Sequence, residues 1–325
     1  MRKLSALSVC LTAGLAVMTS CQRSPAYKHD AGYTPAAEGA SYYNKADSSK
    51  SPTQRIEAMG QPKKRVVVFN FWNDTPVKGT EIGVFAADEL RRGLFNSQRM
   101  IVPKDIKTAS STEDFINGDK VRVAQLVREG RRLGVSVLAI GRVTKIVFRQ
   151  RGDEVGLFRQ KQSLAAVDVE LKLFDVAGGR EIMAVGKSGE ASSNANVVVE
   201  DANLESVQYR AELTKLAVRH AISQIIPDVL RAVEKMTWEG HLAKVQGTKI
   251  FINAGKTSGL VAGDILKVMA PGDDIYDPVT GAYLGRSQGQ LKGTLEVVDF
   301  IGPDGATTEV HTGGNFQEGD VVQLY

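Results

Sequence analysis

The sequence predicts an α+β protein in which a mixed sheet with flanking helices is followed by a small all-β module. Apolar strand patterns alternate with amphipathic helices between residues 64 and 238, which is typical of a sheet covered by helices. From Gly240 onward no helical pattern recurs, and 15 of the 86 residues are Gly. Short apolar runs separated by turn residues in that stretch predict a compact β domain over 239–325.

The composition excludes two broad classes of protein. The 325 residues are 42% hydrophobic and 24% charged, which is typical neither of a disordered polymer nor of a multi-span helical membrane protein. The 41 Lys and Arg residues against 37 Asp and Glu residues leave a net charge of +4 that is spread along the chain. Nucleic acid is therefore not an expected partner.

The first domain is predicted over residues 64–238. A β-branched and aromatic run predicts its first strand, and apolar residues at three- and four-residue spacing predict its helices. Gly134 should end the second helix, Pro227 should kink or break the last one, and the short turn at 177–180 predicts antiparallel neighbours. The predicted strands are 65–72, 100–102, 135–148, 167–173 and 181–186, and the predicted helices are 80–96, 119–133 and 204–233.

Two segments of the C-terminal module repeat a Gly-Asp pair just before a strand, Gly263-Asp264 and Gly319-Asp320. Glycine adopts the positive φ of a tight turn, and Asp can accept a backbone N–H there. The repeat therefore has an explanation in folding, and a binding role is not required.

The N-terminus predicts export and lipidation. A short basic region precedes an uncharged apolar stretch in residues 1–20, which is typical of a signal peptide and shorter than the ~20 residues that span a bilayer. Met18-Thr19-Ser20-Cys21 resembles the bacterial lipobox, so Cys21 is the predicted lipidation site and acyl anchor. Gln22 after the Cys implies the outer membrane, with the protein on its periplasmic face. An unlipidated secreted protein is the alternative.

Residues 21–63 are predicted to form the lipidated Cys and a flexible tether. Between residues 22 and 64 there is no Val, Leu or Phe, so this stretch cannot offset the entropy lost on ordering. A chain of this length reaches roughly 35 Å on average. Four Tyr residues in it could form a docking strip, although scattered linker aromatics are the simpler interpretation.

No residue is predicted to be catalytic, to bind a cofactor or to hold a metal, and the chain is not expected to be an enzyme. Residues 285–289 match G-x-S-x-G, but a strand pattern follows where that motif needs a helix. Residues 255–257 lack the spacing of a phosphate loop, and Asp273, Asp274 and Asp277 lack that of a calcium loop, so solvated turns are expected. The four His residues show no metal-site spacing: His29, His220, His241 and His311.

Three hydrophobic segments with glycine punctuation resemble the CsgG family over about residues 64–236. They are 66–73, 134–143 and 171–182. The strands and helices predicted over the whole range follow the order β-α-β-α-β-β-β-α. The C-terminal module is similar to the C-terminal domain family of flagellar assembly protein T, through 252–255, 259–264, 277–285 and 319–322. Both resemblances imply a homo-oligomer that works in cell-envelope assembly or secretion, of the curli type or associated with an appendage. Its partners would be other envelope or appendage assembly proteins.

Two other functions stay open. One is a self-made outer-membrane pore, which would need two hairpins of ~9–11-residue strands with one lipid-facing set. Residues 149–161 carry charges on both alternating sets, whereas the set Gly189, Ala191, Ser193, Ala195, Val197 and Val199 is uncharged. The charged hairpin of residues 149–161 therefore disfavours a pore. The other function is a tethered activator or adaptor of a peptidoglycan synthase, which the tether followed by this α/β fold would also suit.

Overall fold

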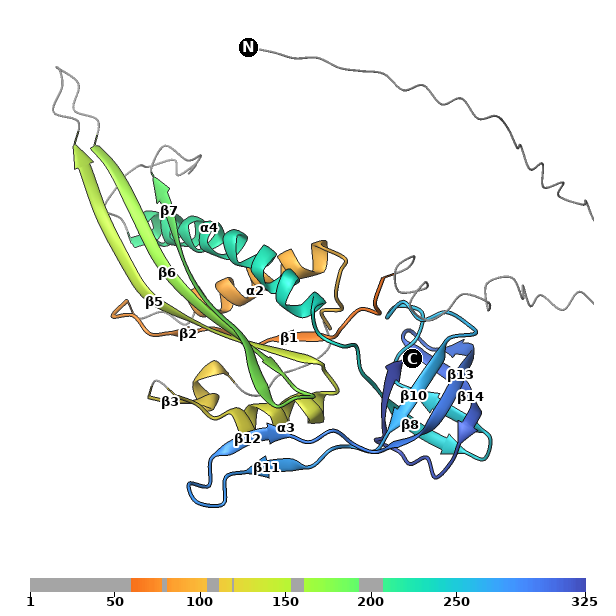
Figure 1. Cartoon of the computed structure of the whole chain (residues 1–325). Helices are drawn as coiled ribbons and strands as arrows, with labels where there is room; N and C mark the ends of the chain where they lie inside the picture. The colour runs from red at the N-terminus through yellow and green to blue at the C-terminus, as the bar shows by residue number, and fades with distance from the viewer. Residues whose placement is uncertain (1–59, 78–80, 104–110, 119, 153–160, 193–206) are drawn as a thin grey trace, which may run out of the picture. The chain divides into compact units, whose positions relative to one another are not determined.

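The computed structural model describes residues 60–77, 81–103, 111–118, 120–152, 161–192 and 207–325 (Figure 1). All of them belong to one compact unit, Ala46–Tyr325. Cys21 and almost all of the predicted tether lie outside the described residues, as do the tips of both hairpins considered for a pore. None of the helices in these ranges is both long and apolar enough to cross a membrane.

A five-stranded sheet forms the centre of the N-terminal part. The short strand β1 (Val66–Val68) pairs in parallel with β5 (Val137–Gly152), and β6 (Lys161–Asp175) and β7 (Arg180–Ser192) follow as antiparallel neighbours. The predicted antiparallel hairpin around 177–180 is confirmed. β7 is an edge strand, because β6 is its one partner among the described strands.

Helices cover both faces of this sheet, which confirms the predicted α+β class (Figure 1). α2 (Glu81–Asn96) and α4 (Val207–Glu234) pack on one face, where the odd-numbered side chains of β6 from Ala165 to Leu173 are fully buried. α3 (Val123–Leu133) and the 3₁₀ turn η1 (Thr112–Phe115) pack on the other face. Gly134 ends α3 with φ of 64°, as predicted.

Four details differ from the sequence expectations. The run 65–72 is not one strand: it divides into β1 and β2 (Trp72–Asn73), because Phe71 donates its N–H to Gly83 of α2 between them. Residues 100–102 make only a single bridge, at Ile101. A small hairpin of β3 (Ile116–Asn117) and β4 (Lys120–Val121) precedes α3, which therefore starts later than expected. α4 continues through Pro227 without a break.

The C-terminal part is a closed barrel with its own core, as the all-β prediction requires. Its core includes Trp238, Leu266 and Val322, which are buried. A separate hairpin of β11 (Asp274–Tyr276) and β12 (Tyr283–Arg286) leaves the barrel between β10 and β13. The barrel strands are β8 (Gly240–Gln246), β9 (Lys249–Ile252), β10 (Ile265–Met269), β13 (Leu291–Ile301), β14 (Gly305–Gly313) and β15 (Val321–Leu324).

The repeated Gly-Asp pairs have the turn role that the sequence predicts. Gly263 and Gly319 both have φ of 90°, a conformation that side chains other than glycine rarely adopt. The Asp264 carboxylate accepts the N–H of Val261 at 2.8 Å, and that of Asp320 accepts the N–H of Gln317 at 2.8 Å. Each pair therefore closes the turn that starts a barrel strand.

Two glycines of β7 give a matched test of the packing between the sheet and α4. A Cβ at Gly189 would lie 2.0 Å from the backbone oxygen of Ala217, whereas a Cβ at Gly186 would make ordinary contacts, 3.7 Å from the Glu170 side chain and 3.9 Å from the Val169 carbonyl oxygen. We expect Gly189→Ala to lower the free energy of unfolding by about 1–3 kcal/mol, because α4 must move away from the sheet. Gly186→Ala should change it by less than about 0.5 kcal/mol. Urea denaturation followed by circular dichroism measures both; equal values would contradict this packing.

Candidate functional site

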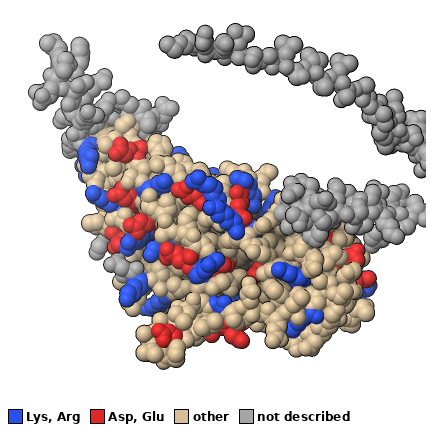
Figure 2. Space-filling view, viewed as in Figure 1, with Lys and Arg blue, Asp and Glu red and all other residues tan. Residues whose placement is uncertain are grey.

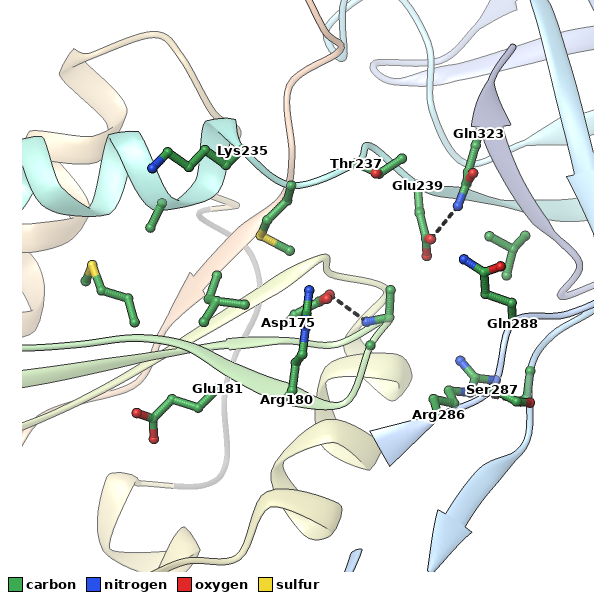
Figure 3. A pocket seen from close by; sticks show the side chains of 18 of the residues that line it. Asp175, Arg180, Glu181, Lys235, Thr237, Glu239, Arg286, Ser287, Gln288 and Gln323 are labelled. Carbon is green, nitrogen blue, oxygen red and sulfur yellow. Dashed lines mark hydrogen bonds between the residues drawn. The ribbon is translucent and has the colours of Figure 1, made fainter. Parts of the chain in front are cut away.

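An open groove of about 900 Å³ lies beside β7 (Figure 3). One side is the outer edge of β7, from Arg180 to Val185, together with the end of the β6–β7 turn. A second side is the C-terminal end of α4 and the segment that leads to β8, and the third is the barrel with residues 286–289. We call this cavity the β7 groove.

The edge of β7 that borders the groove carries unpaired backbone groups. Farther along the strand, the carbonyls of Ser188 and Glu190 turn away from β6 and meet Gln224 and His220 of α4, at 3.1 and 2.6 Å. Strand residues alternate, so Ala184 and Gly186 also direct their N–H and C=O groups away from β6. No described strand pairs with the edge at these two residues.

Two carboxyl groups lie deep in the groove and are partly buried. Asp175 accepts the N–H of Ala177 at 3.0 Å, and Glu239 accepts the amide of Gln323 at 2.7 Å. Burial raises the pKa of both groups, and for Glu239 the negative charge of Asp175 raises it further. The interior of the groove therefore disfavours additional negative charge.

The exposed charges at the groove are mainly positive. Arg180, Arg231 and Lys235 are exposed, and Glu181 is the one exposed carboxylate among the described lining residues. The third inner carboxylate, Asp228, is held by Lys187 at 3.6 Å and by Arg231. Elsewhere, on the face shown in Figure 2, acidic and basic side chains are interspersed, so no broad field of one sign is present there.

A half-buried carboxylate links the sheet to the barrel. Asp304, in the β13–β14 turn, accepts the backbone N–H groups of Gly255 and Ser258, both at 2.9 Å, and the Ser258 hydroxyl at 2.7 Å. Arg65, next to β1, donates to the same carboxylate at 2.8 Å. Burial alone would raise the pKa of Asp304, but these donors outweigh it and hold the pKa below its usual value.

A second link joins α3 to the β11–β12 hairpin. The Arg131 guanidinium pairs with Asp274 at 2.5 Å, and the Tyr283 hydroxyl lies 3.5 Å from the same carboxylate. Gly179 of the β6–β7 turn packs against this hairpin so closely that a Cβ there would lie 2.0 Å from the Tyr283 hydroxyl. The hairpin therefore fixes the start of β7.

The short motifs occupy turns, as the sequence predicts. Ser287 follows β12, its hydroxyl accepts the N–H of Asp273 at 2.9 Å, and no helix follows it. Thr257 donates to the carbonyl of Pro303 at 2.6 Å in a turn that no helix follows, so it is not part of a phosphate loop. Asp277 accepts the N–H of Val279 and the hydroxyl of Thr280, both at 2.8 Å.

The three described histidines lie on different elements, and His29 lies outside the described residues. His241 is partly buried, and burial, then the charges of Arg286 and Arg65, lower the pKa of its imidazole. His220 contacts the edge of β7, and His311 is exposed on the barrel. Within the described ranges, no three His, Cys, Asp or Glu side chains form a group that could hold a metal ion.

The two hairpins considered for a pore are described only in part. β5 and β6 stay paired as far as Gly152 and Lys161, and residues 153–160 lie outside the described ranges. In the second hairpin, Gly189 and Ala191 belong to β7 and are buried against α4. The lack of charge at these two positions is therefore explained by helix packing; residues 193–206 lie outside the described ranges.

Comparisons with known proteins identify no family for this chain. No known family matches the sequence, and no curated protein matches it. A structure of hypothetical protein CT253 from Chlamydia trachomatis is 14% identical and covers 53% of this chain and 98% of its own, with a TM-score of 0.37. A PelC dodecamer from Paraburkholderia phytofirmans is 14% identical and covers 51% and 88%, with a TM-score of 0.32.

Lipoprotein GNA1162 from Neisseria meningitidis is 16% identical and covers 52% of this chain and 99% of its own, with a TM-score of 0.27. Other matched structures are also bacterial lipoproteins, from Caulobacter crescentus and Acinetobacter baumannii. These TM-scores are too low for any likeness to carry an argument about this chain. None of these structures is of a CsgG channel, so the resemblance to that family stays a prediction.

Removal of the Asp304 carboxylate should destabilise the protein strongly. Asp304→Ala leaves two backbone N–H groups and the Ser258 hydroxyl without their acceptor and removes the carboxylate partner of Arg65, which keeps the Asn253 carbonyl as an acceptor. We expect a loss of about 2–4 kcal/mol in the free energy of unfolding. Glu309→Ala, which removes an exposed carboxylate from the adjacent strand, is the control and should change it by less than about 0.5 kcal/mol. Urea denaturation measures both, and a small effect of Asp304→Ala would contradict the link.

Glu239 gives a test of the charge inside the groove. Because its pKa is raised in the folded protein, the ionised carboxylate lowers stability above the folded pKa, and this effect vanishes below the unfolded value of about 4.3. Gln at this position keeps an acceptor for Gln323. We expect Glu239→Gln to raise the free energy of unfolding at pH 7.5 and to match the wild type near pH 4.

The control for this experiment is Glu181→Gln, which removes the exposed carboxylate of the same groove and should have little effect at either pH. Denaturant titrations at both pH values measure the difference. If Glu239→Gln were destabilising at pH 7.5, the ionised carboxylate would be favourably bound, and the electrostatic description of the groove would be wrong.

Proposed function

We propose that this chain is a bacterial outer-membrane lipoprotein on the periplasmic face, which acts as an oligomeric assembly or secretion component of the cell envelope. The lipobox-like segment ending at Cys21 supports the anchor. The role in assembly means that the protein acts by binding copies of itself and other proteins. The finer assignment, to a CsgG-like protein of the curli type or associated with an appendage, rests on the strand patterns of residues 64–236.

The observation that supports this function best is the open edge of β7 in the β7 groove. Edge strands expose backbone groups that readily pair with another chain, so folded proteins usually cover or blunt them. Here the far end of the edge is contacted by side chains of α4, while Ala184 lines the groove and Gly186 is exposed. A surface of this kind suits protein recognition.

A non-enzymatic role is part of the proposal. The motif serine, Ser287, uses its hydroxyl as an acceptor for the backbone N–H of Asp273. The raised pKa values of Asp175 and Glu239 have burial as their main cause. Structural carboxylates are the simplest interpretation of both.

The anchor is tested by Cys21→Ala. Acylation requires the thiol, so the variant should lose its lipid and be released from outer membranes by a salt wash, while the wild type stays bound. Labelling with a radioactive or clickable palmitate and membrane fractionation measure the two effects. Cys10→Ala, which changes the other cysteine of the chain, should leave both unchanged. Retention of Cys21→Ala in washed outer membranes would contradict the anchor.

The oligomer is tested by negative-stain electron microscopy of the lipidated protein in mild detergent, with light scattering for its mass. A ring without a detergent belt around protein strands supports an envelope scaffold. A ring with such a belt would favour a secretion pore. Monomers would overturn the oligomeric proposal and favour the tethered activator or adaptor.

A further inference from the structure

We propose that the β7 groove binds an extended acidic segment of a partner protein, which adds to the open edge of β7 as a further strand. The inference rests on the proposed role in assembly, and it names the partner's chemistry. It does not depend on the lipid anchor or on the number of subunits. Backbone pairing would supply the affinity, and the side chains around the groove would select the partner.

The accessible edge is short and free of obstructing side chains. Ala184 lines the groove, and Gly186 follows just beyond it. Both residues are small and exposed, and both direct their backbone groups away from β6. Beyond them, the α4 side chains Gln224 and His220 occupy the acceptors of the edge. Pairing is therefore confined to the segment around these two residues, which suits one strand of a few residues.

The groove offers adaptable apolar surface on three of its elements. Met183 comes from β7, Met236 follows α4, and Met269 ends β10. Methionine side chains are flexible and polarizable, so they fit apolar side chains of different shapes. Because the side chains of a bound strand alternate, one set of them can lie against these methionines while the other faces the rim.

The charges at the rim select an acidic strand. Arg180, Arg231 and Lys235 are exposed, and the inner carboxyl groups are engaged by donors of the protein itself. Only Glu181 offers an exposed carboxylate among the described lining residues. Arg231 is paired with Asp228, so an acidic segment would meet Arg180 and Lys235 as the main cations of the rim, against the one exposed carboxylate of Glu181. A basic segment would meet two like charges and one opposite charge.

The shape of the groove disfavours a second copy of this chain as the occupant. The groove has a wall on each side, α4 and the barrel, so it accommodates a single strand better than the edge of a whole sheet.

Peptide binding to the full-length lipidated protein in detergent micelles tests the inference. The probe is a fluorescein-labelled peptide of about eight residues that alternates Glu and Val, with blocked ends. The comparison peptide alternates Lys and Val. Fluorescence anisotropy should show binding of the Glu–Val peptide at least about tenfold tighter than that of the Lys–Val peptide. When the Glu–Val peptide is bound, backbone hydrogen exchange of the protein should slow in the segment that contains Ala184 and Gly186.

Two modifications test whether the backbone edge makes the contact. Ala184→Pro removes an N–H that faces the groove but no bond to β6, and edge strands tolerate Pro at such positions. We expect it to weaken binding about five- to tenfold. Two N-methylated peptides, one methylated at every Glu and one at every Val, make the test independent of the variant's stability. Only one of these residue types can direct its N–H to β7, so one peptide should lose binding and the other should keep it.

Several outcomes would overturn the inference: no binding of either peptide, equal binding of both, or full binding of both N-methylated peptides. Charge reversal, Arg231→Glu with Lys235→Glu, should exchange the preference to the Lys–Val peptide, and an unchanged preference would also contradict it. A monomer that binds the Glu–Val peptide would keep the inference and remove the oligomer. A ring that binds neither peptide would keep the oligomeric proposal and overturn the inference.

Discussion

The contact between Arg65 and Asp304 determines how the sheet and the barrel share one site. Asp304 would be an uncompensated buried carboxylate without its four donors, and Arg65 is the donor that comes from the sheet side. Arg65 immediately precedes β1, whose register with β5 is fixed by three consecutive pairs. The barrel turn is thereby tied to a rigid strand, and one wall of the β7 groove is held at a defined place.

The open edge of β7 lies between two ends of the strand that packing contacts hold in place. At its start, Gly179 packs against Tyr283, and Arg131 holds that hairpin through Asp274. At its far end, Gly189 lies against the backbone of α4. Glycine is needed at both contacts because the neighbouring atoms leave no room for a Cβ. The free backbone at Ala184 lies between them, so its accessibility follows from packing at both ends.

Local patterns in the sequence were sufficient for most elements. Alternation over 167–173 predicted the strand that became the centre of β6, and the spacing of apolar residues over 80–96 predicted α2 almost to the residue. The run 65–72 was misassigned because its division depends on Phe71 bonding to Gly83, a contact from another element. Pro227 was expected to break α4, but burial of Val229 and Val233 beyond it maintains the helix.

The groove could not be predicted in the same way. Its links join residues 143 and 239 positions apart, and single Asp or Arg residues at such separations carry no local pattern. The edge of β7 was equally hidden, because periodicity identifies a strand but not which of its sides lacks a neighbour. The one signal in the sequence was that β7 contains small residues, Ala184, Gly186 and Gly189. Only the folded protein shows that Gly189 packs against α4, whereas Ala184 and Gly186 are exposed at the edge.

The chemistry of the groove divides recognition between two parts. A strand edge pairs with almost any extended backbone, so on its own it would give affinity without selectivity. The partly buried carboxyls of Asp175 and Glu239 disfavour further negative charge inside, while Arg180 and Lys235 favour it at the rim. A suitable strand therefore places apolar side chains inward and acidic ones outward, which is a requirement that few unrelated segments meet.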